Sequence, residues 1–516
     1  MICADTGGKL VVERSERLPL HRLVGWHALS RSDIHRWDRL ERGSARPARR
    51  ARAAVLAAVM LAGGLAGCGS GGSQPGPART MPGQAGECPS AYRPPDPRRP
   101  EVDLSFDVEP DHTRVLGREV VVFTPDRPVD ELVFRLWPNG PEGGRTSGRL
   151  DVTRADALGS GRFTLEPAGA RPGTPGTLLH LRLPRQVPAG EAVTADLDFV
   201  LRLPNQAADD RLGRSATTAW WGSGYPLLAW ERGHGWDREP ASPLSGETAV
   251  SEAARLRLTV TAPAADTVLM PGVISAPPNP AGAGRRRWRS TASAVRDVAV
   301  AVGPFRLAAS RGGVPVTAGV APEVAESAQA VHEQVVRAVR SMADRFGPYP
   351  FEGLSVAVLP GIGDDGFEYP GVVLLGTANQ RVNVPHEVAH QWFYGMVGNN
   401  QARDPWLDEA FATYAEMVVN GTGVRRRELV RPGPVGAPMS AFGDDDSRYL
   451  AVVYSKGAAA LITARREVGP AAFDAALRCY VAANAWRIVV PADLARALAG
   501  LPAATSVLRR AGALTE

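Results

Sequence analysis

Two histidines, His386 and His390, stand four residues apart in the stretch P-H-E-V-A-H-Q-W. On an α-helix this spacing places both imidazoles on one face, about 5–6 Å apart at Cβ, which is close enough for them to share one metal ion. Glu387 lies between them and can direct its carboxylate toward a water molecule on that metal. We therefore expect a helix here, packed so that one face surrounds a metal ion.

A third ligand follows in the next predicted helix. Glu409 comes after eighteen intervening residues, near the start of W-L-D-E-A-F-A-T-Y-A-E. Two neutral imidazoles and one carboxylate are the ligands of a catalytic zinc site, which keeps its fourth position for water. The alternative, two histidines facing solvent on a surface helix, leaves Glu409 unexplained. We predict one Zn²⁺ per chain, held by His386, His390 and Glu409, with Glu387 as the general base.

The positive net charge of +5 comes from the first part of the chain. Residues 1–67 contain 12 Lys and Arg against 6 Asp and Glu, and the remainder contains 47 against 48. The body of the protein is therefore nearly neutral. A nucleic-acid partner has no electrostatic support and is not expected.

The basic region belongs to a predicted export signal. Arginines between residues 46 and 52 precede a short apolar run over 53–65, and L-A-G-C ends at Cys68. This pattern predicts a signal peptide over 43–67 that resembles the bacterial lipobox, in which the cysteine is acylated. We expect a cell-surface lipoprotein anchored to the outer face of the bacterial plasma membrane; a secreted protein or an uncleaved anchor is the alternative. Residues 1–42 are an unpatterned leader, and the true translation start is expected near residue 43.

The remaining cysteines suggest a disulfide. Cys3 lies in the leader and Cys68 would carry lipid, so Cys88 and Cys479 are left as an even pair in an oxidising compartment. Whether these two sulfurs meet depends on the fold.

Periodicity divides the rest of the chain into three parts. Residues 68–98 form a flexible linker rich in Gly, Pro and Ser. Short alternating runs predict an antiparallel β domain over 99–310. Helical periodicity begins at Pro322 and predicts a mostly helical domain with a small sheet over 311–516. The predicted fold class is thus α+β and multidomain. The aromatic segment from Trp220 to Trp236 either packs in the core or lines a substrate cleft.

Two further motifs fit a metal-dependent hydrolase. Gly366 and Glu368 lie in G-F-E-Y-P-G beside a predicted strand, where an acidic residue on an edge strand can receive a substrate ammonium; an ordinary turn carboxylate is the alternative. Tyr454 in Y-S-K-G is a suitable donor to an oxyanion. Lys456 follows it and is the only lysine after residue 9. A core tyrosine with a snorkelling lysine is the alternative here.

Together, H-E-x-x-H, eighteen residues, E, an upstream G-F-E and a downstream Y-x-K-G resemble the aminopeptidase N family of zinc metallopeptidases, the gluzincins. The resemblance covers about residues 99–516 and implies a β domain followed by a thermolysin-like catalytic domain. It implies that Glu368, with Gly366 beside it, binds the substrate α-amine and that Tyr454 stabilises the tetrahedral intermediate. Asp404 occupies an acidic position of the family for which a structural or metal-supporting role is expected.

The sequence departs from the family at several positions. The usual G-x-M-E-N reads D-G-F-E-Y, with Asp365, Phe367 and Tyr369 at positions that the family fills differently, and Ala410 replaces a glycine. The chain also ends about sixty residues after Tyr454. We therefore expect no large C-terminal helical domain over the cleft, and an open, wetter site.

These observations predict a zinc metallopeptidase that removes N-terminal residues from peptides. Two other hypotheses stay open: a non-catalytic lipoprotein that binds peptides on a zincin fold, and a zinc hydrolase that needs no free N-terminal amine. Neither the preferred residue nor the oligomeric state follows from the sequence.

Overall fold

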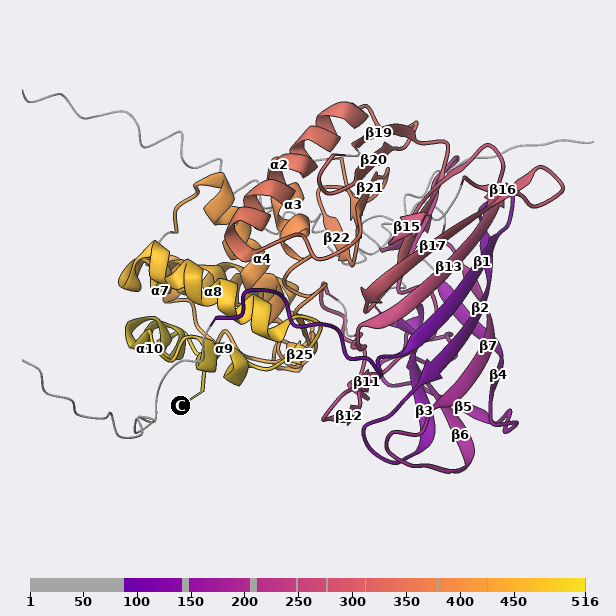
Figure 1. Cartoon of the computed structure of the whole chain (residues 1–516), viewed down its shortest axis with the longest axis horizontal. Helices are drawn as coiled ribbons and strands as arrows, with labels where there is room; N and C mark the ends of the chain where they lie inside the picture. Colours follow the sequence, from indigo (N-terminus) through magenta and orange to yellow (C-terminus); the bar gives the residue numbers. More distant parts are fainter. Residues whose placement is uncertain are drawn as a thin grey trace, which may run out of the picture. The chain divides into compact units, whose positions relative to one another are not determined.

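The computed structural model describes residues 88–515, except 142–147, 205–210, 247–248, 275–276, 311, 378–379 and 425. Strands occupy the first half of this part and helices dominate the second, so the predicted α+β fold class is confirmed (Figure 1). Among these residues, no helix combines the length and the apolar character needed to cross a lipid bilayer. The predicted leader, signal peptide and lipidated Cys68 lie outside the described residues.

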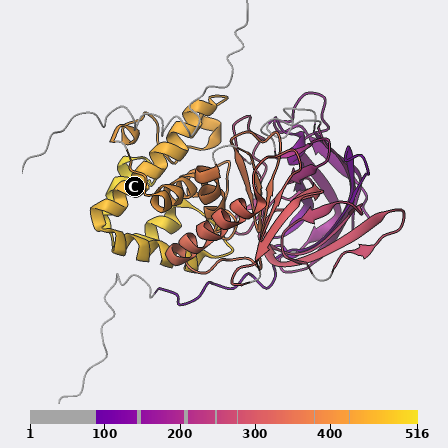
Figure 2. The same ribbon diagram turned by 90° about the horizontal axis from the view of Figure 1, so that it is seen from above.

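The largest sheet has the strand order β15-β17-β13-β1-β2-β7-β4, with β16 paired to β17. Buried and intermediate residues alternate along β1, so one face of the sheet covers a core and the other meets solvent. Figure 2 shows these strands curving around that core. The strands are β1 (Glu101–Val108), β2 (Arg114–Phe123), β4 (Arg149–Ala157), β7 (Val193–Arg202), β13 (Ala254–Pro263), β15 (Val273–Ile274), β16 (Asn279–Pro280) and β17 (Arg285–Val295).

One strand pair departs from the antiparallel prediction. β1 and β13 run parallel, with Val102 opposite Leu256 and Leu104 opposite Leu258. Their long connection through the rest of the domain permits this direction, which a tight hairpin would not. The other strand pairs described in this sheet are antiparallel.

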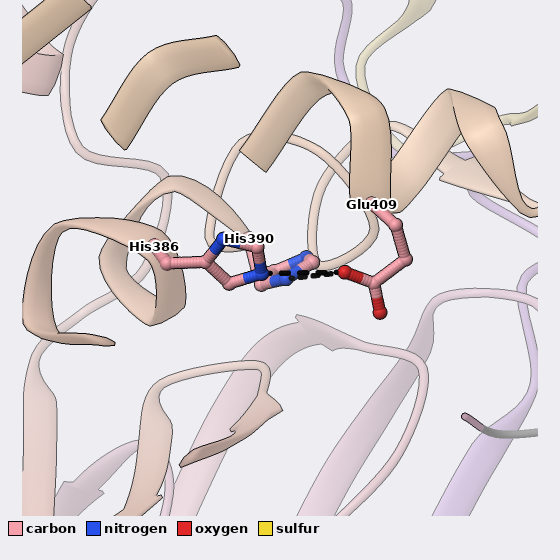
Figure 3. Close-up of side chains that lie close together, drawn as sticks. All are labelled: His386, His390 and Glu409. Carbon is pink, nitrogen blue, oxygen red and sulfur yellow. Dashed lines mark hydrogen bonds and ion pairs between the residues drawn. The ribbon is translucent and has the colours of Figure 1, made fainter. Parts of the chain in front are cut away.

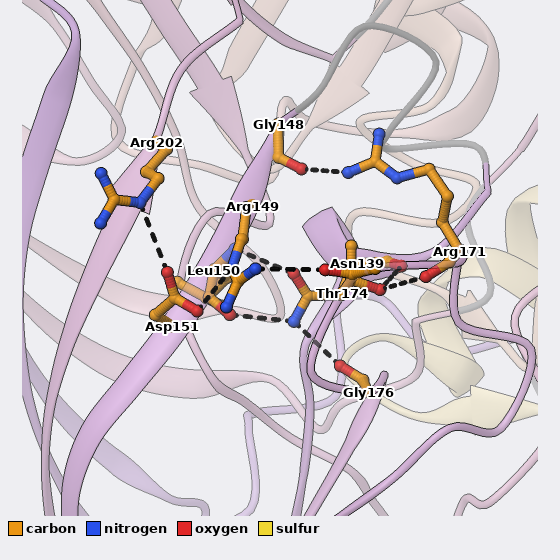
Figure 4. Close-up of polar contacts among 10 residues, drawn as sticks. Asn139, Gly148, Arg149, Leu150, Asp151, Arg171, Thr174, Gly176 and Arg202 are labelled. Carbon is orange, nitrogen blue, oxygen red and sulfur yellow. Dashed lines mark hydrogen bonds and ion pairs between the residues drawn. The ribbon is translucent and has the colours of Figure 1, made fainter.

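A second sheet, β10-β3-β6-β5, packs against the first through a shared apolar core. Its strands are β3 (Val129–Arg135), β5 (Phe163–Glu166), β6 (Leu178–Val187) and β10 (Leu227–Leu228). The fully buried Asn139, on the short helix η2 (Trp137–Asn139), connects it to β4. Its Nδ2 donates to the carbonyls of Leu150 and Gly176, both at 2.9 Å, and its Oδ1 accepts from Leu150 N at 2.9 Å (Figure 4). These bonds satisfy a polar group that would otherwise destabilise the core.

A small sheet, β14-β18-β9-β8, lies between the two apolar cores and is called the interface sheet below. Because side chains alternate along a strand, β9 buries Trp220 in the core of the helical half and Trp221 in the core of the β domain. Both tryptophans are fully buried, so this part of the aromatic segment packs in the core. The strands are β8 (Leu212–Arg214), β9 (Ala219–Gly222), β14 (Thr267–Leu269) and β18 (Ala299–Gly303); the nearby hairpin pairs β11 (Trp230–Glu231) with β12 (Gly235–Trp236).

The second half is built on a mixed sheet with the order β19-β20-β21-β23-β22. Its strands are β19 (Arg306–Ser310), β20 (Val316–Val320), β21 (Leu354–Val358), β22 (Gly366–Tyr369) and β23 (Val372–Leu375). β19 therefore pairs inside this sheet, although the predicted boundary at residue 310 assigned it to the β domain. β22, which carries Glu368, lies at the edge of the sheet, whereas the sequence pattern placed this motif beside a predicted strand.

Helix α2 (Ala328–Phe346) lies beside this sheet, next to β19 and β20 (Figure 1). The helix begins six residues later than Pro322 predicted. Ser327 has an extended backbone and its hydroxyl accepts from Ala330 N, so it caps the first turn. The side-chain cap sets the start of this helix, and the proline lies in the preceding turn.

The remaining helices form the part of the molecule farthest along the chain, coloured orange to yellow in Figure 1. They are α3 (Gln380–Ala389), α4 (Trp406–Asn420), α5 (Arg426–Leu429), α6 (Asp446–Tyr449), the π-helix η4 (Leu450–Lys456), α7 (Gly457–Val468), α8 (Pro470–Asn484), α9 (Pro491–Ala497) and α10 (Pro502–Arg510). The 3-10 turn η3 (Met439–Ala441) precedes α6, and β24 (Gly398–Asn399) pairs with β25 (Ile488–Val489). α3 packs against α2, α4 and the edge strand β22.

The N-terminal segment of the described part is fastened to these helices. Cys88 and Cys479 form a disulfide with an S–S distance of 2.04 Å, so the two sulfurs do meet. Farther along, Tyr92 donates to the carbonyl of Pro348 at 2.5 Å and accepts from Trp392 Nε1 at 3.1 Å. The segment then enters β1, so it joins the helical half to the β domain.

Candidate metal centre

Helix α3 and the turn after it carry both predicted histidine ligands. The ring centroids of His386 and His390 lie 4.8 Å apart, and each residue is 1% exposed. Val384, Val388 and Ala389 on the same segment are buried in the core of the helical half, which fixes the rotation of the helix. The spacing of four residues thus places both rings on one face, as predicted.

Glu409, in the first turn of α4, completes the group. Its Oε2 lies 3.2 Å from His386 Nε2 and 3.5 Å from His390 Nε2 (Figure 3). Ligand atoms about 2.0–2.1 Å from one zinc ion at tetrahedral angles lie about 3.3–3.4 Å from one another. The observed separations lie on either side of that value, so the three side chains fit one zinc ion.

The electrostatics of the site favour a cation. Burial raises the pKa of Glu409, but the field of His390 and hydrogen bonds with both histidines hold it well below its usual value. Burial lowers the pKa of His390, but Asp408, Glu368 and Glu409 together raise it well above its usual value. Buried carboxylates thus surround the imidazole, and a proton or a metal ion at its ring nitrogen relieves their mutual repulsion.

Two carboxylates on α4 contact the far nitrogens of the histidine rings. Asp408 Oδ1 lies 2.6 Å from His390 Nδ1, and Glu416 Oε2 lies 3.6 Å from His386 Nδ1. Such partners orient a metal-binding imidazole and raise its basicity. Sequence reasoning missed both residues and pointed to Asp404, which instead contacts Arg403. The sequence did offer one signal for Asp408, because this acidic residue directly precedes the Glu409 ligand.

Glu387 and Gly366 lie against each other. Glu387 is 1% exposed. A Cβ atom added at Gly366 would lie 2.7 Å from Glu387 Cγ and 2.8 Å from both Cδ and Oε1, closer than nonbonded atoms approach. The absent side chain of Gly366 therefore leaves the space that the Glu387 carboxylate occupies. This glycine affects the proposed base, whereas the prediction linked it to substrate binding.

Glu368 lies on the edge strand β22 within reach of the metal centre. Three atoms lie within 4.8 Å of one another here: a carboxylate oxygen of Glu368, a ring nitrogen of His390 and a carboxylate oxygen of Asp408. Glu368 is 2% exposed, and its Oε2 lies 3.5 Å from Nη1 of Arg211. Nothing in the sequence had drawn attention to Arg211.

Tyr454 lies beside His386, in the π-helix η4. Its ring is parallel to that of His386, with an interplanar angle of 2° and centroids 6.2 Å apart. π-Helical turns occur frequently at functional sites. Lys456 Nζ donates to the carbonyls of Arg431 at 2.9 Å and Gly433 at 2.6 Å, so its ammonium holds the preceding loop against this helix.

Ala410, at a position where the family has glycine, is accommodated by a glycine on another helix. A Cβ atom added at Gly457 would lie 2.5 Å from Ala410 Cβ, so α4 and α7 contact each other closely here. The site is also more enclosed than predicted. Tyr454, at 9%, and Glu409, at 6%, are among its more exposed side chains, so the expectation of an open, wetter site is not met.

Comparison with known proteins agrees with this geometry. Residues 333–509 match the model of the peptidase family M1 domain. Aminopeptidase M1-B of Oryza sativa subsp. japonica is 24% identical over 28% of this chain and 20% of its own length, and aminopeptidase N of Streptomyces lividans is 29% identical over 22% of this chain and 16% of its own. The chain thus spans about a fifth of the length of the curated relatives that it matches.

Solved structures share the fold over most of the chain. The crystal structure of the M1 zinc metallopeptidase from Deinococcus radiodurans has a TM-score of 0.61 and 22% sequence identity, covering 82% of this chain and 95% of its own. A mutant of that protein bound to a Tyr-Ser-Ala substrate has a TM-score of 0.60 at the same identity, covering 83% of this chain and 97% of its own. Residues 333–509 therefore form a peptidase family M1 domain, the family of aminopeptidase N, as the motifs predicted.

Proposed function

We propose that this chain is a zinc-dependent aminopeptidase that hydrolyses the first peptide bond of peptides with a free N-terminus. The observation that carries the proposal is the position of Glu409 Oε2, 3.2 and 3.5 Å from the Nε2 atoms of His386 and His390. These three side chains would hold one Zn²⁺ through two nitrogens and one oxygen, a donor set typical of catalytic zinc. When bound, the ion polarises a carbonyl group and makes water more acidic.

Glu387 is placed to move the proton. It follows His386 on α3 and lies against Gly366 at the start of β22. As a general base it would accept a proton from the attacking water and then return it to the departing amine. The same carboxylate can perform both transfers because the amine leaves from the atom that the water attacks.

Glu368 and Tyr454 would position the substrate. A peptide could add to the outer edge of β22 by main-chain hydrogen bonds, with its N-terminus at Glu368. The Glu368 carboxylate would then bind the α-ammonium and limit cleavage to the first residue. The Tyr454 hydroxyl would donate to the carbonyl oxygen as negative charge develops there.

The decisive experiment is Glu387→Ala, assayed with aminoacyl-anilides and by metal analysis. Removing a general base is expected to lower kcat by about 10²–10⁴-fold while zinc still binds, because Glu387 is not a ligand. Glu467→Ala, which removes an exposed carboxylate of α7, is the matched control and should retain activity. Full turnover in Glu387→Ala would refute the mechanism.

A second candidate is a zinc hydrolase that does not need a free amine, which the Arg211 contact to Glu368 favours. N-acetylated and free substrates separate the two, because acetylation removes the charge that Glu368 would bind. A protein that only binds peptides would hydrolyse neither form, with or without a chelator.

We also propose that the protein is exported and anchored by a lipid on Cys68, with secretion as the alternative. The apolar run before L-A-G-C supports this, and so does the Cys88–Cys479 disulfide, because disulfides persist in oxidising compartments. Cys68→Ser should move the protein from the membrane fraction to the medium. Retention in the membrane fraction would contradict the lipid anchor.

A further inference from the structure

Arg211 introduces a buried positive charge into the metal centre from the β domain. It directly precedes β8, the outer strand of the small sheet between the two cores, and it is 4% exposed. Its Nη1 lies 3.5 Å from Glu368 Oε2, and the exposed fractions of the two side chains are 5% and 3%. The pair thus joins the two halves of the chain at the carboxylate proposed to bind the substrate amine.

Aromatic rings fix the guanidinium in this position. Its central carbon lies 4.6 Å from the centroid of Phe367 and 5.9 Å from that of Tyr369, the two neighbours of Glu368 on β22. Contacts of this kind with a ring face favour a cation, more strongly when water is excluded. Phe367 and Tyr369 are two positions at which the sequence departs from the family motif. Two residues that depart from the family motif therefore surround the guanidinium of Arg211.

This placement changes what the subsite can bind. A substrate ammonium at Glu368 would lie near the guanidinium, and two like charges repel strongly where water is excluded. A first residue with a carboxylate side chain carries a negative charge close to its own α-ammonium, and this charge can offset that of the guanidinium. Its ammonium can then contact Glu368 while its carboxylate contacts Arg211, whose planar group matches a carboxylate well.

Asp297 is a second acidic group whose charge interacts with that of Arg211. Burial raises the pKa of Asp297 to about 6, and Arg211 is among the groups that lower it. Asp297 already accepts hydrogen bonds from Ser223 Oγ at 2.5 Å and from Val298 N at 2.6 Å. These bonds hold its carboxylate just before β18, so it balances part of the charge of Arg211 from a fixed position.

We propose that Arg211 is a specificity-determining residue that favours peptides beginning with Glu or Asp over those beginning with their neutral counterparts Gln and Asn. The proposal rests on the aminopeptidase function proposed above. In this proposal the subsite for the first residue prefers acidic side chains, and Arg211 contacts the carboxylate of that side chain.

The test compares kcat/KM for Glu-, Gln-, Asp-, Asn- and Leu-anilides. A charged hydrogen bond to a carboxylate predicts a Glu-to-Gln ratio of roughly 10–100 in the wild type. Arg211→Gln should bring this ratio to about 1 or below, and Arg211→Lys should keep part of it. Arg286→Gln, which removes an exposed arginine of β17, is the matched control and should leave the ratio unchanged.

Each result decides between the two proposals. Hydrolysis of Leu- or Gln-anilide at rates equal to or above that of Glu-anilide in the wild type would overturn the role of Arg211 and leave the aminopeptidase standing. A ratio that stays high in a folded Arg211→Gln would also overturn it. If that variant folds poorly, the wild-type ratio and Arg211→Lys still decide. Failure to hydrolyse any anilide, with zinc present, would remove the aminopeptidase function itself.

Discussion

The carboxylate of Asp408 is expected to strengthen zinc binding without touching the ion. Its Oδ1 lies 2.6 Å from His390 Nδ1, and both side chains are 1% exposed. A buried carboxylate at this distance fixes the tautomer of the ring, so that Nε2 is the nitrogen left for the metal. Asp408→Asn keeps the size of the side chain and removes its charge.

The structure indicates two costs for this substitution. The short charged hydrogen bond to His390 becomes a neutral one, and the amide nitrogen of the new side chain would face Gln401 Nε2, which now donates to Asp408 Oδ2 at 3.0 Å. Loss of such a supporting partner lowers metal affinity by about 10–100-fold, equivalent to about 1.4–2.8 kcal/mol. We expect Asp408→Asn to bind zinc that much more weakly.

Competition with a chromophoric chelator measures this affinity directly. Asp404→Asn is the matched control, because Asp404 is also buried but contacts Arg403. Thermal unfolding in excess zinc shows whether Asp408→Asn remains folded. A folded variant with wild-type zinc affinity would refute the argument that Asp408 orients His390.

Three further predictions follow from single features. Gly366→Ala places a Cβ atom 2.7–2.8 Å from three atoms of Glu387 and should displace that carboxylate, lowering kcat by about 10²-fold with zinc content unchanged, as steady-state kinetics and metal analysis would show. Burial raises the pKa of Glu252 to about 7, so the folded state holds a proton on this carboxyl at pH values where the unfolded chain has lost it. The stability that this proton provides is complete below about pH 4.5 and is lost as the pH rises through 7. Glu252→Gln should remove that loss, up to about 3 kcal/mol, when urea unfolding is compared at pH 5 and pH 8; an unchanged difference would contradict it. Cys88→Ser opens a disulfide that spans 391 residues and should lower the free energy of unfolding by about 2–5 kcal/mol, whereas a wild-type midpoint in urea would exclude a stabilising role.

The part of the site that the sequence predicted depends on local geometry. A separation of four residues on a helix places His386 and His390 on one face whatever surrounds them, and Glu409 begins a helix with its own apolar pattern. These features required only the regular dimensions of helices.

The contacts that the sequence did not predict depend on how distant elements pack. Arg211 is 157 residues from Glu368, and the two meet because the packing of the two halves brings the residue before β8 to the carboxylate on β22. Adjacency to Glu409 marks Asp408 as a candidate in the sequence, but the rotation of α4 against α3 decides that it faces His390. The parallel pairing of β1 with β13 has the same origin, because alternation marks a strand but not the direction of its neighbour.

The β domain takes part in the charge balance of the metal centre. Glu368, Glu387, Asp408 and Glu409 are all buried in the helical half, with exposed fractions between 1% and 6%. One zinc ion would balance two of these charges, and the guanidinium of Arg211 lies within ion-pair distance of Glu368. Separating the two halves would remove that cation and expose either Trp220 or Trp221, because these residues pack into the two different cores. The small interface sheet therefore supplies both the packing and the charge that the site requires, and the helical half alone would leave its carboxylates less well balanced.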